Sequence, residues 1–223
     1  MKKTALVILT VLAAAALSLN AQSLNLKIGS FYPTMDSDLW DLNRKNLVFD
    51  KADMLGIYWG AEFELFVGRQ LSLALEAGHY KKDIYTMYKN AEYDDGTPIY
   101  QDFSLRITSI EADFKLYPMG HRREFNPYIG CGIGFYVWKY YQGGEFVDFE
   151  EEIVYEGEAY TNTITPGFNA KVGFVYRYKR SIGISFEARY VYVKGQLSSL
   201  FEGFEKLDLG GVALTIGVSL FLR

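Results

Sequence analysis

The sequence predicts an all-β protein: an eight-stranded antiparallel up-and-down transmembrane β-barrel. One observation is the strict alternation from Gly211 to Arg223, where Val, Leu and Ile residues alternate with Gly, Ala, Thr and Ser and, at the end, Phe221, as in a strand with two unlike faces. The apolar stripe from Val212 to Leu222 is roughly 24 Å tall at a tilt of ~45°. This matches the ~25 Å lipid-facing band of an outer-membrane barrel.

A second observation is that seven more alternating segments precede this one, joined by connections of alternating length. The connections after the second, fourth and sixth segments are short, which is typical of a barrel with short periplasmic turns and long extracellular loops. We expect the first strand to pair with the eighth. The expected strands are about Leu24–Phe31, Leu55–Val67, Leu71–Tyr85, Phe103–Tyr117, Pro127–Tyr141, Thr165–Tyr178, Ser181–Lys194 and Leu207–Leu222, and the long loops are Tyr32–Met54, Thr86–Asp102, Gln142–Ile164 and Gly195–Lys206.

The fourth segment changes parity in its middle. Phe103, Leu105 and Ile107 are at odd positions, whereas the apolar residues from Ile110 to Leu116 are at even ones. One extra residue near Thr108 and Ser109 would restore the two faces, so we predict a β-bulge there.

The N-terminus has the pattern of a secretory signal peptide. Lys2 and Lys3 precede an apolar run from Ala5 to Leu19, and Ala21 supplies a small residue for cleavage. We therefore expect a signal peptide over residues 1–21 and a barrel domain over 22–223. An N-terminal membrane anchor is the alternative, but the run is short for a spanning helix.

Composition excludes several classes of function. The formal net charge is −4 and no basic block is present, which argues against binding of nucleic acid. Cys131 is the only cysteine, so no internal disulfide can form. We expect it on the lipid-facing parity, with no metal or nucleophilic role.

Alternation alone does not decide which face points outward, because a soluble lipocalin-like barrel has its apolar face inside. Glycine is frequent on the polar parity, and glycine makes room inside a narrow barrel. The same parity carries charges of both signs, which suits mutual pairing in a lumen because unpaired buried charge is costly. The predicted lumen charge network is Glu62, Glu64, Glu76, Arg106, Glu111, Asp113, Lys115, Lys171, Arg177, Glu187 and Arg189.

Aromatic residues near the strand ends favour lipid outside. Tyr and Trp concentrate at the two interfaces of a membrane. We expect one aromatic girdle by the short turns and one by the long loops. Their members are Tyr117, Tyr128, Tyr176 and Tyr178 on the first side, and Trp138, Tyr140, Tyr141, Tyr190 and Tyr192 on the second.

Two adjacent stretches resemble a known family. The sequence IEADFKLYP over 110–118, followed by NPYIGCGIGFY over 126–136, is similar to the small outer-membrane β-barrel domains of the OmpA/OmpX/OmpW type. The resemblance implies an eight-stranded barrel in the bacterial outer membrane. The resemblance to the OmpW type in particular implies transport of a small hydrophobic molecule.

The sequence offers few groups for catalysis, and we expect no enzyme. His121 lies in a turn and is expected to be solvated, and His79 is expected on the lipid-facing parity. Outer-membrane lipid A deacylases resemble this arrangement, with a His near the outer leaflet and a Ser two residues later, but this chain has Lys81 there.

We expect no cofactor and no metal. The acidic loop between the fifth and sixth strands lacks an EF-hand pattern. Its interleaved aromatics indicate a hairpin that extends above the membrane. The glycines of Pro127–Gly134 have a period of two within a strand, so they are not a phosphate loop.

The interior of eight strands is just filled by side chains, so a wide pore is excluded. The charged lumen is interpreted as a structural network rather than an ion path. The expected role is therefore structural or interactive, in envelope integrity, adhesion or surface-loop contacts. The alternatives are a narrow transporter or binder of a small hydrophobic molecule and, third, a lipid-modifying enzyme. The expected partners are outer-membrane lipid and either a surface ligand or a small hydrophobic one.

Overall fold

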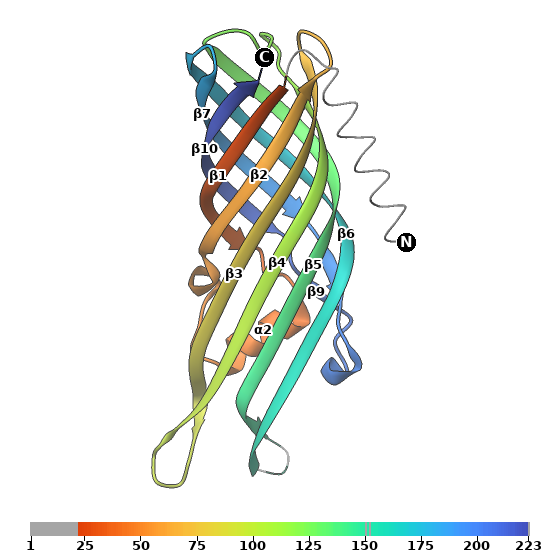
Figure 1. The fold of residues 1–223 in the computed structure, drawn as a ribbon. Coiled ribbons are helices and arrows are strands. Elements are labelled where there is room, and N and C mark those ends of the chain that lie inside the picture. Colours follow the sequence, from red (N-terminus) through yellow and green to blue (C-terminus); the bar gives the residue numbers. More distant parts are fainter. Residues whose placement is uncertain (1–21, 150, 152, 223) are drawn as a thin grey trace.

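The computed structural model describes residues 22–149, 151 and 153–222, and these form a closed antiparallel barrel of eight strands (Figure 1). The order around the barrel is β1-β10-β7-β6-β5-β4-β3-β2. The predicted fold class is confirmed, whereas the predicted signal peptide lies outside the described residues. The barrel strands are β1 (Gln22–Pro33), β2 (Gly56–Phe66), β3 (Leu71–Glu92), β4 (Pro98–Leu116), β5 (Phe125–Asp148), β6 (Ile153–Lys179), β7 (Ile182–Tyr192) and β10 (Gly211–Leu222).

The barrel closes between the two ends of the chain. β1 pairs with β10 along its whole length, from Gln22 opposite Leu222 to Pro33 opposite Gly211. The predicted pairing of the first and last barrel strands is therefore confirmed. Both described chain ends lie at the end of the barrel that carries the short turns (Figure 1). We call this the turn end, and the opposite end the loop end.

Two of the predicted loops are mostly strand. β3 and β4 continue as a hairpin to Glu92 and Pro98, and β5 and β6 continue to Asp148 and Ile153. The predicted strands end early because strict alternation disappears above the lipid while backbone pairing continues. The hairpin expected above the membrane between the fifth and sixth predicted strands is confirmed. Figure 1 shows the two hairpins projecting beyond the other strands.

The two hairpins are joined through one carboxylate. The Tyr93 hydroxyl donates to Glu145 over 2.9 Å, and the backbone N–H of Tyr100 donates to the same carboxylate over 2.9 Å. The bond to Glu145 raises the pKa of Tyr93, because the donating neutral phenol is stabilised. The hairpins therefore form one connected extension at the loop end.

The other two long loops contain short elements that fold against the loop end. The first holds helix α2 (Asp38–Asn46) and the 3₁₀ turn η1 (Lys51–Met54). The last holds β8 (Lys194–Gln196), η2 (Ser199–Phe201) and β9 (Lys206–Asp208). The predicted eighth strand thus begins at Gly211 rather than Leu207. Within residues 22–149, 151 and 153–222, no helix is long and apolar enough to cross a bilayer.

The sequence did not predict α2, although local signals for it exist. Ser37 at the N-cap precedes Asp38, and acidic residues in the first turn suit the positive end of a helix. Leu39, Trp40 and Asn43 share the buried face. This face packs into the mouth of the barrel.

The predicted bulge in β4 is wrong. Pairing of β4 with both neighbours runs without interruption through Thr108 and Ser109. Odd residues therefore face inward along the whole strand, so Phe103, Leu105 and Ile107 are buried. The change of parity arises because the lumen itself changes from ionic to apolar, and the strand has no extra residue.

A labelling experiment tests this register. In a Cys131→Ser background, we expect Arg106→Cys to react with a water-soluble maleimide on the folded barrel, because position 106 is exposed on the outer wall. Ile107→Cys should stay unreactive until the barrel is unfolded, because position 107 is 6% exposed. A reactive cysteine at position 107 together with an unreactive one at position 106 would contradict the continuous register and support a bulge in β4.

Candidate functional site: the filled lumen

The outer wall of the barrel is apolar. Val212, Leu214 and Ile216 of β10 are 41%, 57% and 46% exposed, and their neighbours on the wall are also aliphatic or aromatic. A wall of this kind would not remain in water, because exposed apolar patches of such extent are unfavourable there. The lipocalin-like alternative, with the apolar face inside, is therefore wrong for this chain.

The lumen is filled in three layers along the axis. A small aromatic cluster lies at the turn end, an ionic layer lies in the middle, and a large apolar plug lies at the loop end. Each layer is built by inward-facing residues of several strands.

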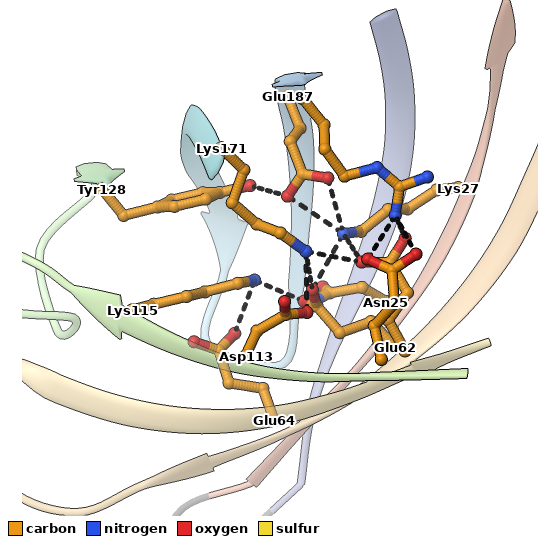
Figure 2. Close-up of polar contacts among 12 residues, drawn as sticks. Asn25, Lys27, Glu62, Glu64, Asp113, Lys115, Tyr128, Lys171 and Glu187 are labelled. Carbon is orange, nitrogen blue, oxygen red and sulfur yellow. Dashed lines mark hydrogen bonds and ion pairs between the residues drawn. The ribbon is translucent and has the colours of Figure 1, made fainter. Parts of the chain in front are cut away.

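Lys27 of β1 lies at the centre of the ionic layer. Its Nζ donates to Glu62 over 2.9 Å, to Glu76 over 3.0 Å and to Glu187 over 3.0 Å. The Lys27 and Glu62 side chains are 1% and 0% exposed. One ammonium group therefore bridges carboxylates from β2, β3 and β7, which are far apart in sequence (Figure 2).

Glu76 of β3 accepts more hydrogen bonds than a single ion pair would supply. Lys171 Nζ lies 2.9 Å and Arg189 Nη1 3.0 Å from its oxygens, and the Tyr58 hydroxyl donates to it over 2.9 Å. Lys171 also reaches Asp113 at 2.7 Å. Glu76 and its donors join most of the strands into one network.

The ionic layer holds more acids than bases. Six carboxylates (Glu62, Glu64, Glu76, Glu111, Asp113 and Glu187) face four cations (Lys27, Lys115, Lys171 and Arg189). Neutral donors satisfy much of the remainder. Tyr117 and Ser72 donate to Glu64, Tyr128 to Glu187, Asn25 to Glu62, and Asn169 to Glu111 and Asp113. Hydroxyls and amides thus stabilise charge that ion pairs alone do not balance.

The structure places nine of the eleven predicted lumen residues in this layer: Glu62, Glu64, Glu76, Glu111, Asp113, Lys115, Lys171, Glu187 and Arg189. Arg177 lies apart, at the turn end, where it stacks on Phe221 with 3.6 Å to the ring centroid and donates to the His121 carbonyl. Arg106 is a wrong prediction, because the continuous register of β4 turns it to the outer wall.

Sequence reasoning missed Lys27 and the neutral donors. Lys27 lies on the same parity of the first strand as Asn25 and Gly29, and the rule used for the other strands would have found it. The tyrosines Tyr58, Tyr117 and Tyr128 were missed because a tyrosine on the inner face gives no charge signal.

Glycines of β5 make the ionic layer fit. A Cβ at Gly132 would lie 1.9 Å from Asp113 Oδ1 and 2.7 Å from the Ala112 carbonyl. A Cβ at Gly134 would lie 2.7 Å from Glu111 Cγ, and one at Gly130 would lie 3.1 Å from Lys171 Cγ and 3.2 Å from Lys115 Cγ. The period-two glycines therefore open the space that long charged side chains fill.

The apolar plug closes the loop end. Trp40 of α2 is fully buried, stacks edge-on against Tyr140 at 5.3 Å and donates its indole N–H to the Asp208 carbonyl over 3.0 Å. Phe49 packs on Phe103 at 4.7 Å. Asn43 donates to Tyr140 over 2.9 Å, which fixes the far end of the helix. Loop residues and barrel wall thus form one core.

A small cavity lies between the plug and the ionic layer. It measures about 20 Å³ and is lined by Tyr58, Tyr80, Ile107, Tyr136 and Arg189, among others. A cavity of this size has room for about one water molecule. A second, of about 10 Å³, lies near Asn25 and Glu64 toward the turn end.

The turn end is closed by aromatic rings, and this corrects the prediction for His121. His121 is 5% exposed and stacks on Phe66, with ring centroids 4.1 Å apart. Its Nδ1 lies 3.0 Å from the Arg69 carbonyl. The turn folds inward because Phe66, Tyr117 and Tyr128 offer an apolar surface there, so this histidine is not solvated.

Four members of the predicted aromatic girdles also face inward. Tyr117, Tyr128, Trp138 and Tyr140 are each at most 2% exposed. Tyr128, Trp138 and Tyr140 lie on the inner parity of β5, and Tyr117 follows β4 on its inner parity. Distance from a strand end alone does not distinguish the two faces. Tyr176, Tyr178, Tyr190 and Tyr192 are exposed on the wall as expected.

The remaining candidate groups do not assemble a catalytic set in the described chain. His79 lies on the outer wall, and its Nδ1 is 2.9 Å from the Thr108 hydroxyl. Cys131 is exposed on the same wall. Oxygens of Glu62, Glu76 and Asp113 lie close enough together to hold a metal, but the ammonium groups of Lys27, Lys115 and Lys171 already contact them.

Comparison with known proteins relates the chain through its fold. The sequence matches no protein-family model and no curated protein. Among solved structures it is similar to the outer membrane protein OprG from Pseudomonas aeruginosa, with a TM-score of 0.52, 14% identity, and coverage of 92% of this chain and 98% of that one. It is also similar to Ail, the attachment invasion locus protein of Yersinia pestis, with a TM-score of 0.51, 10% identity, and coverage of 92% of this chain and 99% of that one.

A third similar structure is a major outer membrane protein from Thermus thermophilus, with a TM-score of 0.50, 12% identity, and coverage of 91% and 100%. The fold is therefore that of the small eight-stranded outer-membrane β-barrels, as the sequence resemblance implied. The apolar outer wall indicates that lipid surrounds this barrel.

The excess of acid in the lumen predicts that removing a cation destabilises the barrel more than removing the charge of a carboxylate. Lys27→Met leaves three carboxylates without their shared cation, and we expect it to lower the free energy of unfolding by about 3–5 kcal/mol. Glu64→Gln keeps the shape and reduces the excess of acid, and the Ser23 hydroxyl 3.4 Å from Glu64 Oε2 can accept from the new amide, so this substitution should cost less. Urea titration in lipid vesicles measures both, with Lys179→Met on the outer surface as the matched control. A larger loss for Glu64→Gln would contradict this charge count.

Proposed function

We propose that this protein is a sealed outer-membrane barrel with a structural or surface-contact role and no wide pore. The observation that carries the proposal is the filled lumen, in which a paired ionic layer and an apolar plug follow one another along the axis. An aqueous channel would need a continuous path, whereas within the part of the chain that the structure describes the cavity beside Arg189 measures only about 20 Å³ and the one near Glu64 about 10 Å³.

The extension at the loop end supports the surface-contact part of the proposal. β3 to β6 continue past the barrel as paired strands, and the shared contacts of Glu145 hold the two hairpins together. Paired strands keep their shape better than free loops, so they suit recognition of a partner on the cell surface.

Recording of ion current across planar bilayers tests the sealed lumen. We expect the wild-type barrel to give no stable conductance steps, because crossing the ionic layer would require breaking several buried ion pairs. Lys27→Met, which opens the network, serves as a comparison on the same barrel. A steady ohmic conductance of the wild type would contradict the proposal.

A second candidate, a narrow transporter or binder of a small hydrophobic molecule, is supported by the apolar lining of the loop end. Phe31, Tyr80, Phe103, Ile107 and Trp138 line this half of the lumen from the barrel side. If α2 moved outward, it would uncover an apolar chamber that ends at the ionic layer. The plug would then act as a movable stopper.

A reversible cross-link between α2 and the wall separates the two candidates. The Asn43 amide donates to Gln142 over 3.2 Å, so the thiols of Asn43→Cys and Gln142→Cys in a Cys131→Ser background lie within reach of a short bis-methanethiosulfonate reagent. The sealed-barrel proposal predicts equal uptake of a hydrophobic dye by cells carrying the cross-linked and the uncross-linked protein. Loss of uptake on cross-linking, with recovery when a reductant removes the cross-link, would favour the transporter.

A further inference from the structure

The outward position of Arg106 creates a feature that the lumen does not explain. Arg106 lies opposite Lys81 of β3 on one side and opposite Lys139 of β5 on the other. All three side chains are exposed on the outer wall. Three neighbouring strands therefore present three cations side by side, and we call Lys81, Arg106 and Lys139 the cationic row.

Such a row is unfavourable unless anions offset it, because like charges directly opposite one another in a sheet repel. Lys81 pairs with Asp83 at 2.5 Å. Within the described residues, Arg106 and Lys139 have no carboxylate at salt-bridge distance, and Lys139 instead lies 5.8 Å from the ring centroid of Tyr160. Asp83 also attracts Arg106 electrostatically, and Asp102 lies farther along β4 toward the loop end. The carboxylate of Asp83 thus faces three cations, which leaves the row with a net positive charge for an external anion.

The row lies at the top of the apolar wall. Leu71 begins the outward face of β3, and Lys81 follows ten residues later, so the row begins roughly 24 Å above the turn-end edge at a tilt of ~45°. Ile110 and Phe135, which are 63% and 64% exposed, lie on the wall below it. The thickness of a barrel's lipid-facing band is about 25 Å. The row therefore coincides with the interface between lipid tails and headgroups on the loop side.

We propose that the cationic row binds the phosphate of a phosphorylated glycolipid headgroup in the outer leaflet. A guanidinium matches two phosphate oxygens at once, and flanking ammonium groups add charge without a fixed geometry. The apolar residues below the row cover the acyl chains of the same molecule. This inference is independent of whether the lumen is sealed.

Titration of the refolded full chain in zwitterionic detergent, followed by native mass spectrometry, tests the site. The probe is purified bisphosphorylated lipid A, compared with the same lipid after removal of its phosphates. We expect the triple variant K81Q/R106Q/K139Q to bind the bisphosphorylated lipid roughly 10- to 100-fold more weakly, since each cation near an anionic lipid surface contributes about a fivefold factor. The dephosphorylated lipid should bind wild type and variant alike.

The matched control removes three exposed cations at the opposite end, as R122Q/K179Q/R180Q, and should bind lipid A like the wild type. Heat-modifiable gel mobility verifies that each variant is folded. Equal weakening by the control, unchanged binding by the row variant, or equal binding of the dephosphorylated lipid would overturn the proposal. Displacement of the lipid by inorganic phosphate alone would also overturn it, because the row would then hold a free ion.

Discussion

The structure depends on one constraint: charge inside a narrow barrel that stands in lipid must be paired within the barrel itself. Lys27, Lys171 and Arg189 meet this constraint by contacting carboxylates from several strands each. Leaving one such group unpaired would cost several kcal/mol, whereas an apolar core would carry no such penalty. The network therefore stabilises the association of the strands. It also favours the one strand register in which these charged groups contact one another.

The rest of the architecture accommodates this layer. Glycines of β5 at Gly130, Gly132 and Gly134 provide the volume into which the long side chains extend. The aromatic cluster at the turn end and the plug at the loop end separate the layer from water on both sides. Exclusion of water strengthens the ion pairs, because each interaction acts in a medium of low dielectric constant. The helix α2 is thus part of the support of the network as well as a cover.

Sequence reasoning predicted the strands because one face of the wall meets lipid, and this face forces strict alternation over residues such as Val212 to Leu222. It failed where the environment changes along a strand. The lumen turns apolar toward the loop end, and the apolar residues Phe103, Leu105 and Ile107 therefore have the pattern of a lipid-facing row. This pattern wrongly predicts a bulge and an inward Arg106. Above the membrane strict alternation ends, so the full length of β3 and β4 does not follow from it, whereas the interleaved aromatics between the fifth and sixth predicted strands indicate the hairpin that β5 and β6 form there.

The candidate site was predictable in part because strict alternation also identifies the residues that face the lumen. The inward positions of charges such as Glu62 and Glu187 follow from parity alone, because a residue next to a lipid-facing one in the same strand must point into the lumen. The partners that complete the site do not follow from one strand at a time. Glu76 meets Lys27, Lys171 and Arg189 only through closure of the barrel, and the folding of α2 into the mouth depends on an apolar surface assembled from distant strands.

The most direct test of this account is a high-resolution experimental structure of the protein in lipid, with the water molecules along the barrel axis resolved. The account predicts that the Lys27 ammonium lies within hydrogen-bond distance of Glu62, Glu76 and Glu187, with only isolated waters on the axis. A continuous file of water from the turn end to the loop end, with these groups apart, would contradict it.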